Sequence, residues 1–221
     1  MPPLQKSVDY LSAMAILVAF GGLFFGRLMI YPVAAASGTF LERVAARADA
    51  WDWGHRVMLL GMISVLPAAL ALWRILCERS PRLAELAAGL TMFGAMLGVG
   101  QYALDFAMLA AARVEPAAAG EQFLSNLRAD PFVQWAFYRL PDVSQLGLLL
   151  FTVALWRQGP AWRLQAVAVT VAAMASLIGP QVLGNLGVRI ALGLMFAAYA
   201  TVAWKIALRP PQSSPLPEAI P

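Results

Sequence analysis

The chain has 221 residues, of which 61% are hydrophobic and only 13% are charged, whereas soluble domains contain about 25% charged residues. This composition excludes an ordinary water-soluble globule. The formal net charge of +4 does not indicate nucleic-acid binding, because the basic residues are scattered between apolar stretches instead of clustered on one polar face.

The apolar stretches predict an all-α polytopic membrane protein, a bundle of about six transmembrane helices. A span needs about 20 mostly apolar residues, and its backbone must be hydrogen-bonded internally, which requires a helix. The predicted helices are 9–33, 53–76, 84–112, 131–156, 161–179 and 183–207. They place residues 1–209 in a single transmembrane domain, and the proline-rich tail 210–221 is expected to be disordered.

Two of these helices need comment. The first is expected to be retained, because its apolar stretch Tyr10–Ala36 is longer than the core of a signal peptide, which has about 7–15 residues. The fourth contains only a short uninterrupted apolar run, Val143–Trp156, so it must include Phe132–Leu140 to span a bilayer. Pro141 then predicts a kink.

The connections predict the orientation of the chain. Those after the first and third helices are long, and each contains a short amphipathic stretch, Phe40–Ala48 or Ala118–Leu127, suited to the membrane interface. The side with both termini collects eight Lys or Arg against four acidic residues, and the other side is balanced. The positive-inside rule therefore places both termini in the cytoplasm and the long loops outside, in a bacterial-type inner membrane.

Charged and amide residues within the predicted helices concentrate in the outward halves, at spacings of three or four residues that mark one face of each helix. Such groups are costly in lipid unless they pair or reach water, so these faces are expected to point at one another around an outward-open pocket formed by five helices. The candidate pocket residues are Arg27, His55, Arg56, Gln101, Asp105, Arg139, Asp142, Gln145, Asn185 and Arg189.

Asp105 and Asp142 are the deepest acids, and we expect them to pair with Arg139 and with one or two of the other arginines. Two alternatives stay open at this point. The arginines near helix ends can extend to the headgroups with no function, and the deeper charges can form a salt-bridge network that only fixes helix packing.

The sequence predicts no cofactor and no metal site. His55 is the single histidine, which excludes haem ligation by two histidines of one chain, and Cys77 is the single cysteine. A metal would have to be bound by His55 together with carboxylates such as Asp105 and Asp142, which is the less favoured interpretation. No nucleophile–histidine–acid set or phosphate-binding glycine loop is present.

Two glycine pairs, Gly22 with Gly26 and Gly94 with Gly98, have the GxxxG spacing that permits close helix contact. Packing within one chain is the favoured interpretation, and a dimer contact is the alternative.

The run from Trp53 to Ala107, with Gly54-His55, the loop Cys77–Arg82 and Asp105, resembles small polytopic bacterial inner-membrane proteins of unassigned function. The resemblance implies a membrane location and no particular chemistry.

The excess of arginine over acid among the candidate residues favours an anionic ligand, because guanidinium groups suit carboxylate and phosphate. The first hypothesis is a protein that binds or moves a small anionic solute or a lipid headgroup through its outward-facing pocket. The second is an accessory or assembly subunit with a membrane-protein partner or a second copy. The third, less favoured, is an intramembrane enzyme with Asp105 or Asp142 as acid or base beside His55.

Overall fold

The computed structural model describes residues 2–114 and 116–209, and in these ranges all regular structure is helical. The prediction of a disordered tail, 210–221, lies outside the described residues. The helices are α1 (Pro2–Met29), α2 (Tyr31–Ala35), α3 (Phe40–Ala46), α4 (Ala48–Leu76), α5 (Pro81–Ala111), α6 (Ala117–Ala129), α7 (Pro131–Val133), a π-helical segment η1 (Gln134–Arg139), a 3₁₀ turn η2 (Leu140–Asp142), α8 (Val143–Arg157), a 3₁₀ turn η3 (Pro160–Trp162) and α9 (Arg163–Ala207).

Four stretches are long and apolar enough to cross a membrane, namely Leu4–Ala35, Ala48–Leu76, Pro81–Ala111 and Pro160–Ala207. They fit a membrane protein and confirm the all-α class. The count is four because the last two predicted helices are joined in α9, and because α8 alone, with 15 residues, is about 22 Å long.

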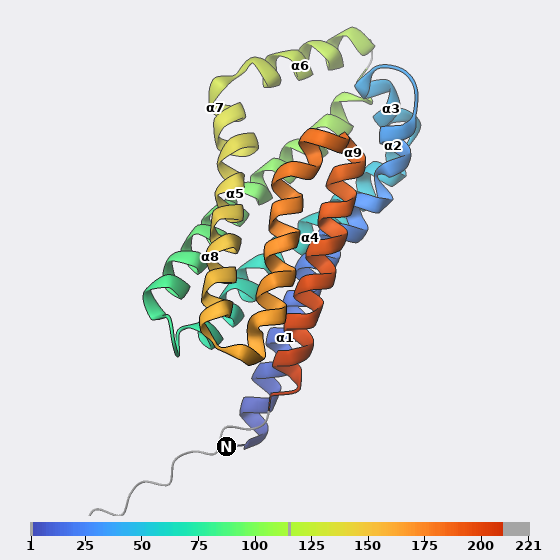
Figure 1. Cartoon of the computed structure of the whole chain (residues 1–221). Coiled ribbons are helices and arrows are strands. Elements are labelled where there is room, and N and C mark those ends of the chain that lie inside the picture. Colours follow the sequence, from blue (N-terminus) through green and yellow to red (C-terminus); the bar gives the residue numbers. More distant parts are fainter. Residues whose placement is uncertain (1, 115, 210–221) are drawn as a thin grey trace, which may run out of the picture.

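Helix α9 is two antiparallel arms (Figure 1). The predicted helix end at residue 179 is wrong, because the first arm continues through Pro180 and the backbone reverses at Gly184, where φ is +53°. Glycine adopts this left-handed conformation without the steric cost of a Cβ. Gly179 and Gly187 then bring the two arms into contact.

The kink predicted near Pro141 is confirmed as an irregular segment. The chain from Pro131 passes through the π-helical η1 and the 3₁₀ turn η2 before the regular helix α8 begins at Val143. The two short amphipathic stretches form the helices α3 and α6, and α6 lies across one end of the bundle (Figure 1).

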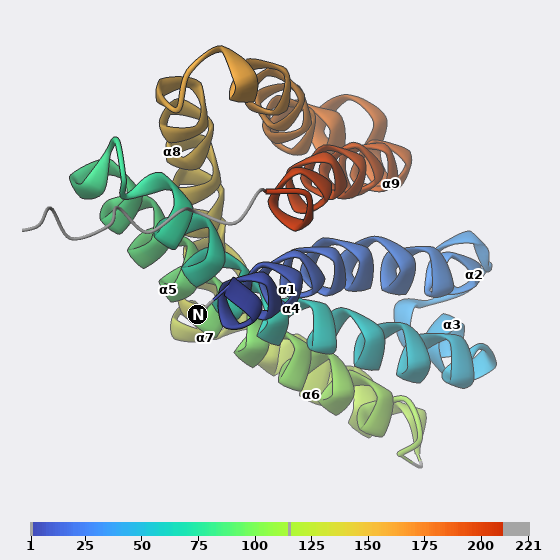
Figure 2. The same cartoon turned by 90° about the horizontal axis from the view of Figure 1, so that it is seen from below.

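The long helices form a ring in which α1 packs on α4, α4 on α5, α5 on α8, α8 on α9, and α9 on α1 (Figure 2). The core between them is rich in alanine, and glycines permit close contact between α1 and α4. A Cβ on Gly22 would lie 2.7 Å from the Cα of Gly61, and Gly94 packs on Ser144. The prediction that the GxxxG pairs serve packing within the chain is thus confirmed.

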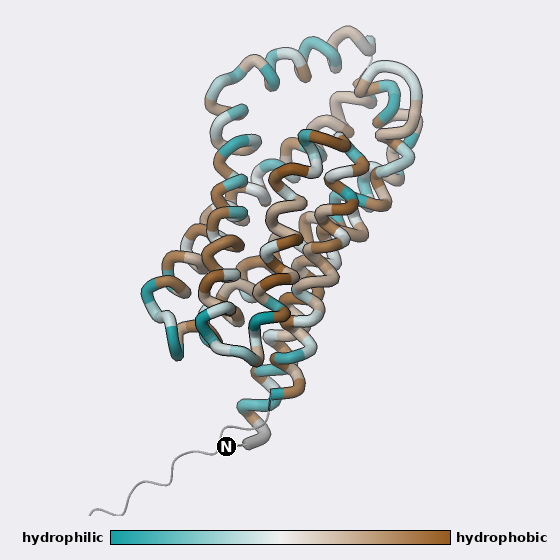
Figure 3. The backbone as a smooth tube through the Cα atoms, viewed as in Figure 1, coloured by the Kyte–Doolittle hydropathy of each residue, from teal (hydrophilic) through white to brown (hydrophobic). Residues whose placement is uncertain are grey.

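The outer surface of the ring is apolar. Each ring helix exposes large hydrophobic side chains that no other part of the described chain covers, among them Phe25, Leu60, Phe93, Val153 and Val171. Hydrophilic residues concentrate at the two ends of the bundle (Figure 3). This arrangement suits contact with lipid around the middle of the bundle.

The two ends differ. The end that we call the terminal end carries the start of α1 and the end of α9, where the Lys6 ammonium donates to the carbonyl of Ala207 over 2.7 Å. The opposite end, the loop end, carries α2, α3, α6 and the reversal at Gly184 (Figure 1). A second hydrophobic cluster around Trp51, Val44 and Leu124 fixes these short helices on the ends of α4 and α5.

Candidate functional site

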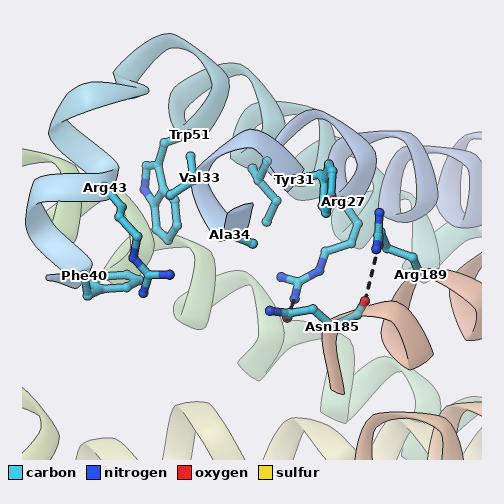
Figure 4. Close-up of a pocket in the computed structure, with 10 residues that line it drawn as sticks. Arg27, Tyr31, Val33, Ala34, Phe40, Arg43, Trp51, Asn185 and Arg189 are labelled. Carbon is cyan, nitrogen blue, oxygen red and sulfur yellow. Dashed lines mark hydrogen bonds between the residues drawn. The ribbon is translucent and has the colours of Figure 1, made fainter. Parts of the chain in front are cut away.

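A pocket of about 180 Å³ lies at the loop end, and three of its lining side chains are arginines (Figure 4). We call it the arginine pocket. It is lined by Arg27, Ile30, Tyr31, Val33, Ala34, Phe40, Arg43, Trp51, Asn185 and Arg189. These residues come from α1, α2, α3, α4 and α9, so the pocket joins segments at both ends of the sequence.

Local sequence features place these residues. Gly26 and Gly54 allow α1 and α4 to approach closely beside Arg27, since a Cβ on Gly26 would lie 2.6 Å from the carbonyl oxygen of Gly54. Thr39 begins α3 with a capping box, in which its side chain accepts from the amide of Glu42 and the Glu42 carboxylate accepts from the amide of Thr39. The reversal at Gly184 presents the next residue, Asn185, to the pocket.

Asn185 connects two of the arginines (Figure 4). Arg27 Nη2 donates to Asn185 Oδ1 over 2.9 Å, and Arg189 Nε lies 3.4 Å from the carbonyl oxygen of Asn185. The Arg189 guanidinium also lies over the ring of Tyr31, 4.0 Å from its centroid. Both guanidinium groups are therefore oriented by uncharged partners, which leaves their positive charges unneutralised.

The third arginine, Arg43, has a buried Nε that finds no hydrogen-bond acceptor in the described part of the chain. No acidic residue lines the pocket, and none of its three arginines forms an ion pair with any residue in the described ranges. The pocket thus combines three positive charges and unused donors with no negative charge, which is the composition of an anion-binding site.

His55 and Asp105 form a buried pair next to this pocket. His55 is 3% exposed, and its Nε2 lies 3.4 Å from Asp105 Oδ2. His55 Nδ1 lies 2.7 Å from the carbonyl oxygen of Trp51, and Trp51 Nε1 donates to the carbonyl oxygen of Asp105 over 2.9 Å. Trp51 therefore touches the arginine pocket and holds both members of the His55–Asp105 pair.

The structure divides the predicted pocket into separate parts. Arg27, Asn185 and Arg189 meet in the arginine pocket as expected, but Asp105 pairs with His55 and with no arginine. Arg56 does not line this pocket and forms an exposed pair with Asp52, four residues earlier on α4. The expected pocket of five long helices is replaced by one in which the short helices α2 and α3 complete a site on α1, α4 and α9.

Asp142 and Arg139 do not pair as predicted. Both are exposed and form no ion pair within the described ranges. The predicted i,i+3 relation assumed a regular α-helix, whereas Arg139 ends the π-helical η1 and Asp142 ends the 3₁₀ turn η2. Gln145 has a buried Oε1 without a hydrogen-bond donor among the described residues, and Gln101 is half-buried on α5.

Sequence reasoning missed Arg43, Tyr31 and Trp51 as pocket residues. Arg43 lies in the amphipathic stretch predicted for the interface and Tyr31 near the predicted end of the first helix, so no spacing rule connects either residue to α9. The signal for Trp51 was present, because it precedes His55 by four residues and both lie on one helical face.

A second missed feature lies at the terminal end. Asp9, 2% exposed, accepts from Arg74 Nη2 over 2.6 Å and from the side-chain Nε2 of Gln5 over 3.1 Å. Arg74 also reaches the Ser12 hydroxyl. The expectation that this half of the helices is almost purely apolar is corrected by this pair, which joins α1 to α4 far from the pocket.

The described residues contain no group of three His, Cys, Asp or Glu side chains that could hold a metal ion. The His55–Asp105 pair supplies only two such groups. Comparison of the chain with protein-family models, with curated proteins and with solved structures finds no match.

Proposed function

We propose that this chain is a multi-pass inner-membrane protein that binds an anionic group, a phosphate or a carboxylate, in the arginine pocket. The observation that carries the proposal is the convergence of Arg27, Arg43 and Arg189 on one pocket with no acidic residue in its lining. Charged side chains placed inside a membrane protein are costly, and an anion in the pocket would neutralise them.

Six membrane crossings are part of this proposal. The arms of α9 on either side of Gly184 contain residues 163–183 and 185–207, or about 31 Å and about 35 Å of helix, which is enough to cross about 30 Å of hydrocarbon. The stretch 131–157 supplies the remaining crossing through η1, η2 and α8. An even number of crossings agrees with the contact between Lys6 and Ala207 at the terminal end.

The orientation follows from charge. The basic excess lies at the terminal end, so the positive-inside rule directs this end to the cytoplasm and the arginine pocket to the outer face. The pocket would then lie near the outer headgroup layer, where both a dissolved anion and the phosphate of a lipid can reach it.

The size of the pocket limits the ligand. Its volume of about 180 Å³ is below the range of about 300–1,000 Å³ for sites that enclose drug-sized molecules. A small anion or a headgroup phosphate fits this limit, and a large solute does not. The apolar lining residues Ile30, Val33 and Ala34 beside the arginines suit a ligand that is charged at one end and apolar at the other.

Binding measurements on the purified, detergent-solubilised protein test the proposal. Inorganic sulfate and phosphate probe a dissolved anion, and phosphatidylglycerol in nanodiscs, with phosphatidylcholine as the neutral lipid, probes a headgroup. Binding of the dissolved anions alone identifies a solute site, and preference for phosphatidylglycerol with no binding of free anions identifies a lipid site.

The variant for this test is Arg189→Gln, and the matched control is Arg139→Gln, which changes an exposed arginine outside the pocket. Loss of one charged hydrogen-bond donor costs about 1.5–3 kcal/mol, so anion affinity should fall about 10- to 100-fold for Arg189→Gln and stay unchanged for Arg139→Gln. Equal affinities in the two variants, or no anion binding by the wild type, would refute the proposal.

A further inference from the structure

We propose that the His55–Asp105 pair is a proton-binding site whose occupancy is coupled to anion binding in the arginine pocket. The inference deepens the proposed function and rests on it. It starts from the contacts of the two ring nitrogens of His55, which favour one arrangement of protons on the pair.

The proton count follows from the partners of the imidazole. Nδ1 lies 2.7 Å from the carbonyl oxygen of Trp51, which can only accept, so Nδ1 carries a hydrogen. Nε2 faces the carboxylate of Asp105 at 3.4 Å. A lone pair on Nε2 facing a negative oxygen is unfavourable, so this contact favours a state with one proton on either Nε2 or the carboxyl group.

Both placements of this proton make the pair neutral. An imidazolium beside a carboxylate and a neutral imidazole beside a carboxylic acid have the same net charge of zero, which is the least costly state for a buried pair. Loss of the proton leaves one negative charge in this position. Gain of a second proton leaves one positive charge.

Trp51 provides the structural connection between the two sites. Its ring lines the arginine pocket, its Nε1 donates to the Asp105 carbonyl, and its own carbonyl accepts from His55. Its ring also contacts the imidazole, with centroids 4.1 Å apart. A change in the charge of the pair and a change in the pocket therefore act on the same side chain.

Electrostatics provides the second connection, because Arg27 of the pocket interacts with Asp105. When the pair loses its proton, the new negative charge neutralises part of the field of Arg27 and weakens anion binding. When the proton returns, the pocket regains its positive potential. Anion affinity should therefore be high at low pH and fall as the pH rises.

Other charged or titratable groups also face this region from the helices packed around it. By element they are Arg27 of α1, Tyr31 of α2, Arg43 of α3, Asp52 and Arg56 of α4, Tyr102 of α5, Arg128 of α6, Tyr138 of η1 and Arg189 of α9. Arginines keep their charge and tyrosines stay neutral across the pH range in which histidines titrate, and Asp52 is paired with Arg56. The His55–Asp105 pair is thus the group whose change of charge would reach the pocket.

Calorimetry of sulfate binding tests the coupling. Sulfate is the probe because its charge is constant over the range, about pH 5 to 8, in which histidines change charge. Repeating the titration in buffers with different ionisation enthalpies gives the number of protons taken up per sulfate. We expect a fractional uptake in the wild type and an affinity about fivefold or more lower at the high end of the pH range.

Asp105→Asn removes one of the two groups that share the proton and should reduce the proton uptake, and Asp142→Asn is the matched control, since Asp142 is exposed and outside both sites. Sulfate binding with no proton uptake and no pH dependence would overturn the coupling and leave the proposed function standing. Absence of binding of both sulfate and phosphatidylglycerol at every pH would refute both the proposed function and the coupling.

A measurement without any anion examines the pair itself. His55 is the only histidine, so isotope-labelled imidazole gives one assignable NMR signal. We expect a hydrogen on Nδ1 and a titration curve that differs between the wild type and Asp105→Asn. When sulfate saturates the pocket, a fivefold coupling should shift the wild-type midpoint to higher pH by about 0.7 unit. Hydrogen on Nε2 alone, or identical titrations in the two proteins, would refute the proton site even if Asp105→Asn binds no sulfate.

Discussion

Replacing Gly26 by alanine tests how closely α1 and α4 must approach to form the site. The added Cβ would lie 2.6 Å from the carbonyl oxygen of Gly54 and 2.9 Å from the amide nitrogen of Met58, both backbone atoms of α4. Since ordinary contacts are about 3.5–4.0 Å, the helices must separate by about 1 Å. Overpacking of this kind costs about 1–3 kcal/mol.

Gly89→Ala is the matched control, because a Cβ on Gly89 meets no atom within 4 Å. Alanine should stabilise that helix by about 0.5–1 kcal/mol relative to glycine. At about 2–4 °C per kcal/mol for a chain of this size, the melting temperature should fall by about 2–12 °C in Gly26→Ala and rise by up to about 4 °C in Gly89→Ala.

Thermal unfolding of both variants in one mild detergent, followed by intrinsic tryptophan fluorescence, measures this difference. Sulfate affinity provides a second readout, because separation of α1 from α4 moves Arg27 relative to Trp51 and should weaken binding in Gly26→Ala. Equal melting temperatures for the two variants would refute the close contact between α1 and α4, and with it the proposed reason for the glycines.

Two further changes test parts of the structure outside the pocket. Arg74→Gln removes the charged partner of Asp9 and should lower the free energy of unfolding by about 3 kcal/mol, since it leaves a buried carboxylate without its ion pair. Arg56→Gln is the control. It breaks an exposed pair and should cost less than about 0.5 kcal/mol in the same denaturation assay. Thr39→Ala removes the capping box of α3 and should cost about 1 kcal/mol, seen as faster amide exchange in α3; unchanged exchange would show that the second hydrophobic cluster alone holds that helix.

The helices were largely predictable from the sequence because their apolar runs have the length that a bilayer requires. The residues at which the helices end were less predictable. The first arm of α9 continues past residue 179 because Pro180 is accommodated within the helix. The backbone reverses only at Gly184, which can adopt a positive φ. Hydrophobicity does not distinguish these two positions, since both residues interrupt an otherwise apolar run.

The site was predictable only in part. Helical spacing correctly grouped Asn185 with Arg189, and position along the helix correctly placed Arg27 at the same end. Spacing does not say which neighbour a face meets, so Asp105 was assigned to an arginine when its partner is His55. An ion pair between two helices depends on how each helix is rotated and on how far one is shifted along the other. Both are set by packing between the helices, so the sequence of one helix does not predict them.

The contact between Arg27 and Asn185 joins residues 158 positions apart in the chain. During synthesis, α1 reaches the membrane first, and Arg27 has no partner from α9 until the last hairpin has been inserted and has turned at Gly184. The pocket is therefore finished at the final step of assembly, together with closure of the helix ring. A chain truncated before Gly184 would lack the Asn185 acceptor of Arg27, so the arginine would stay in the bundle without this partner, which is costly in a membrane.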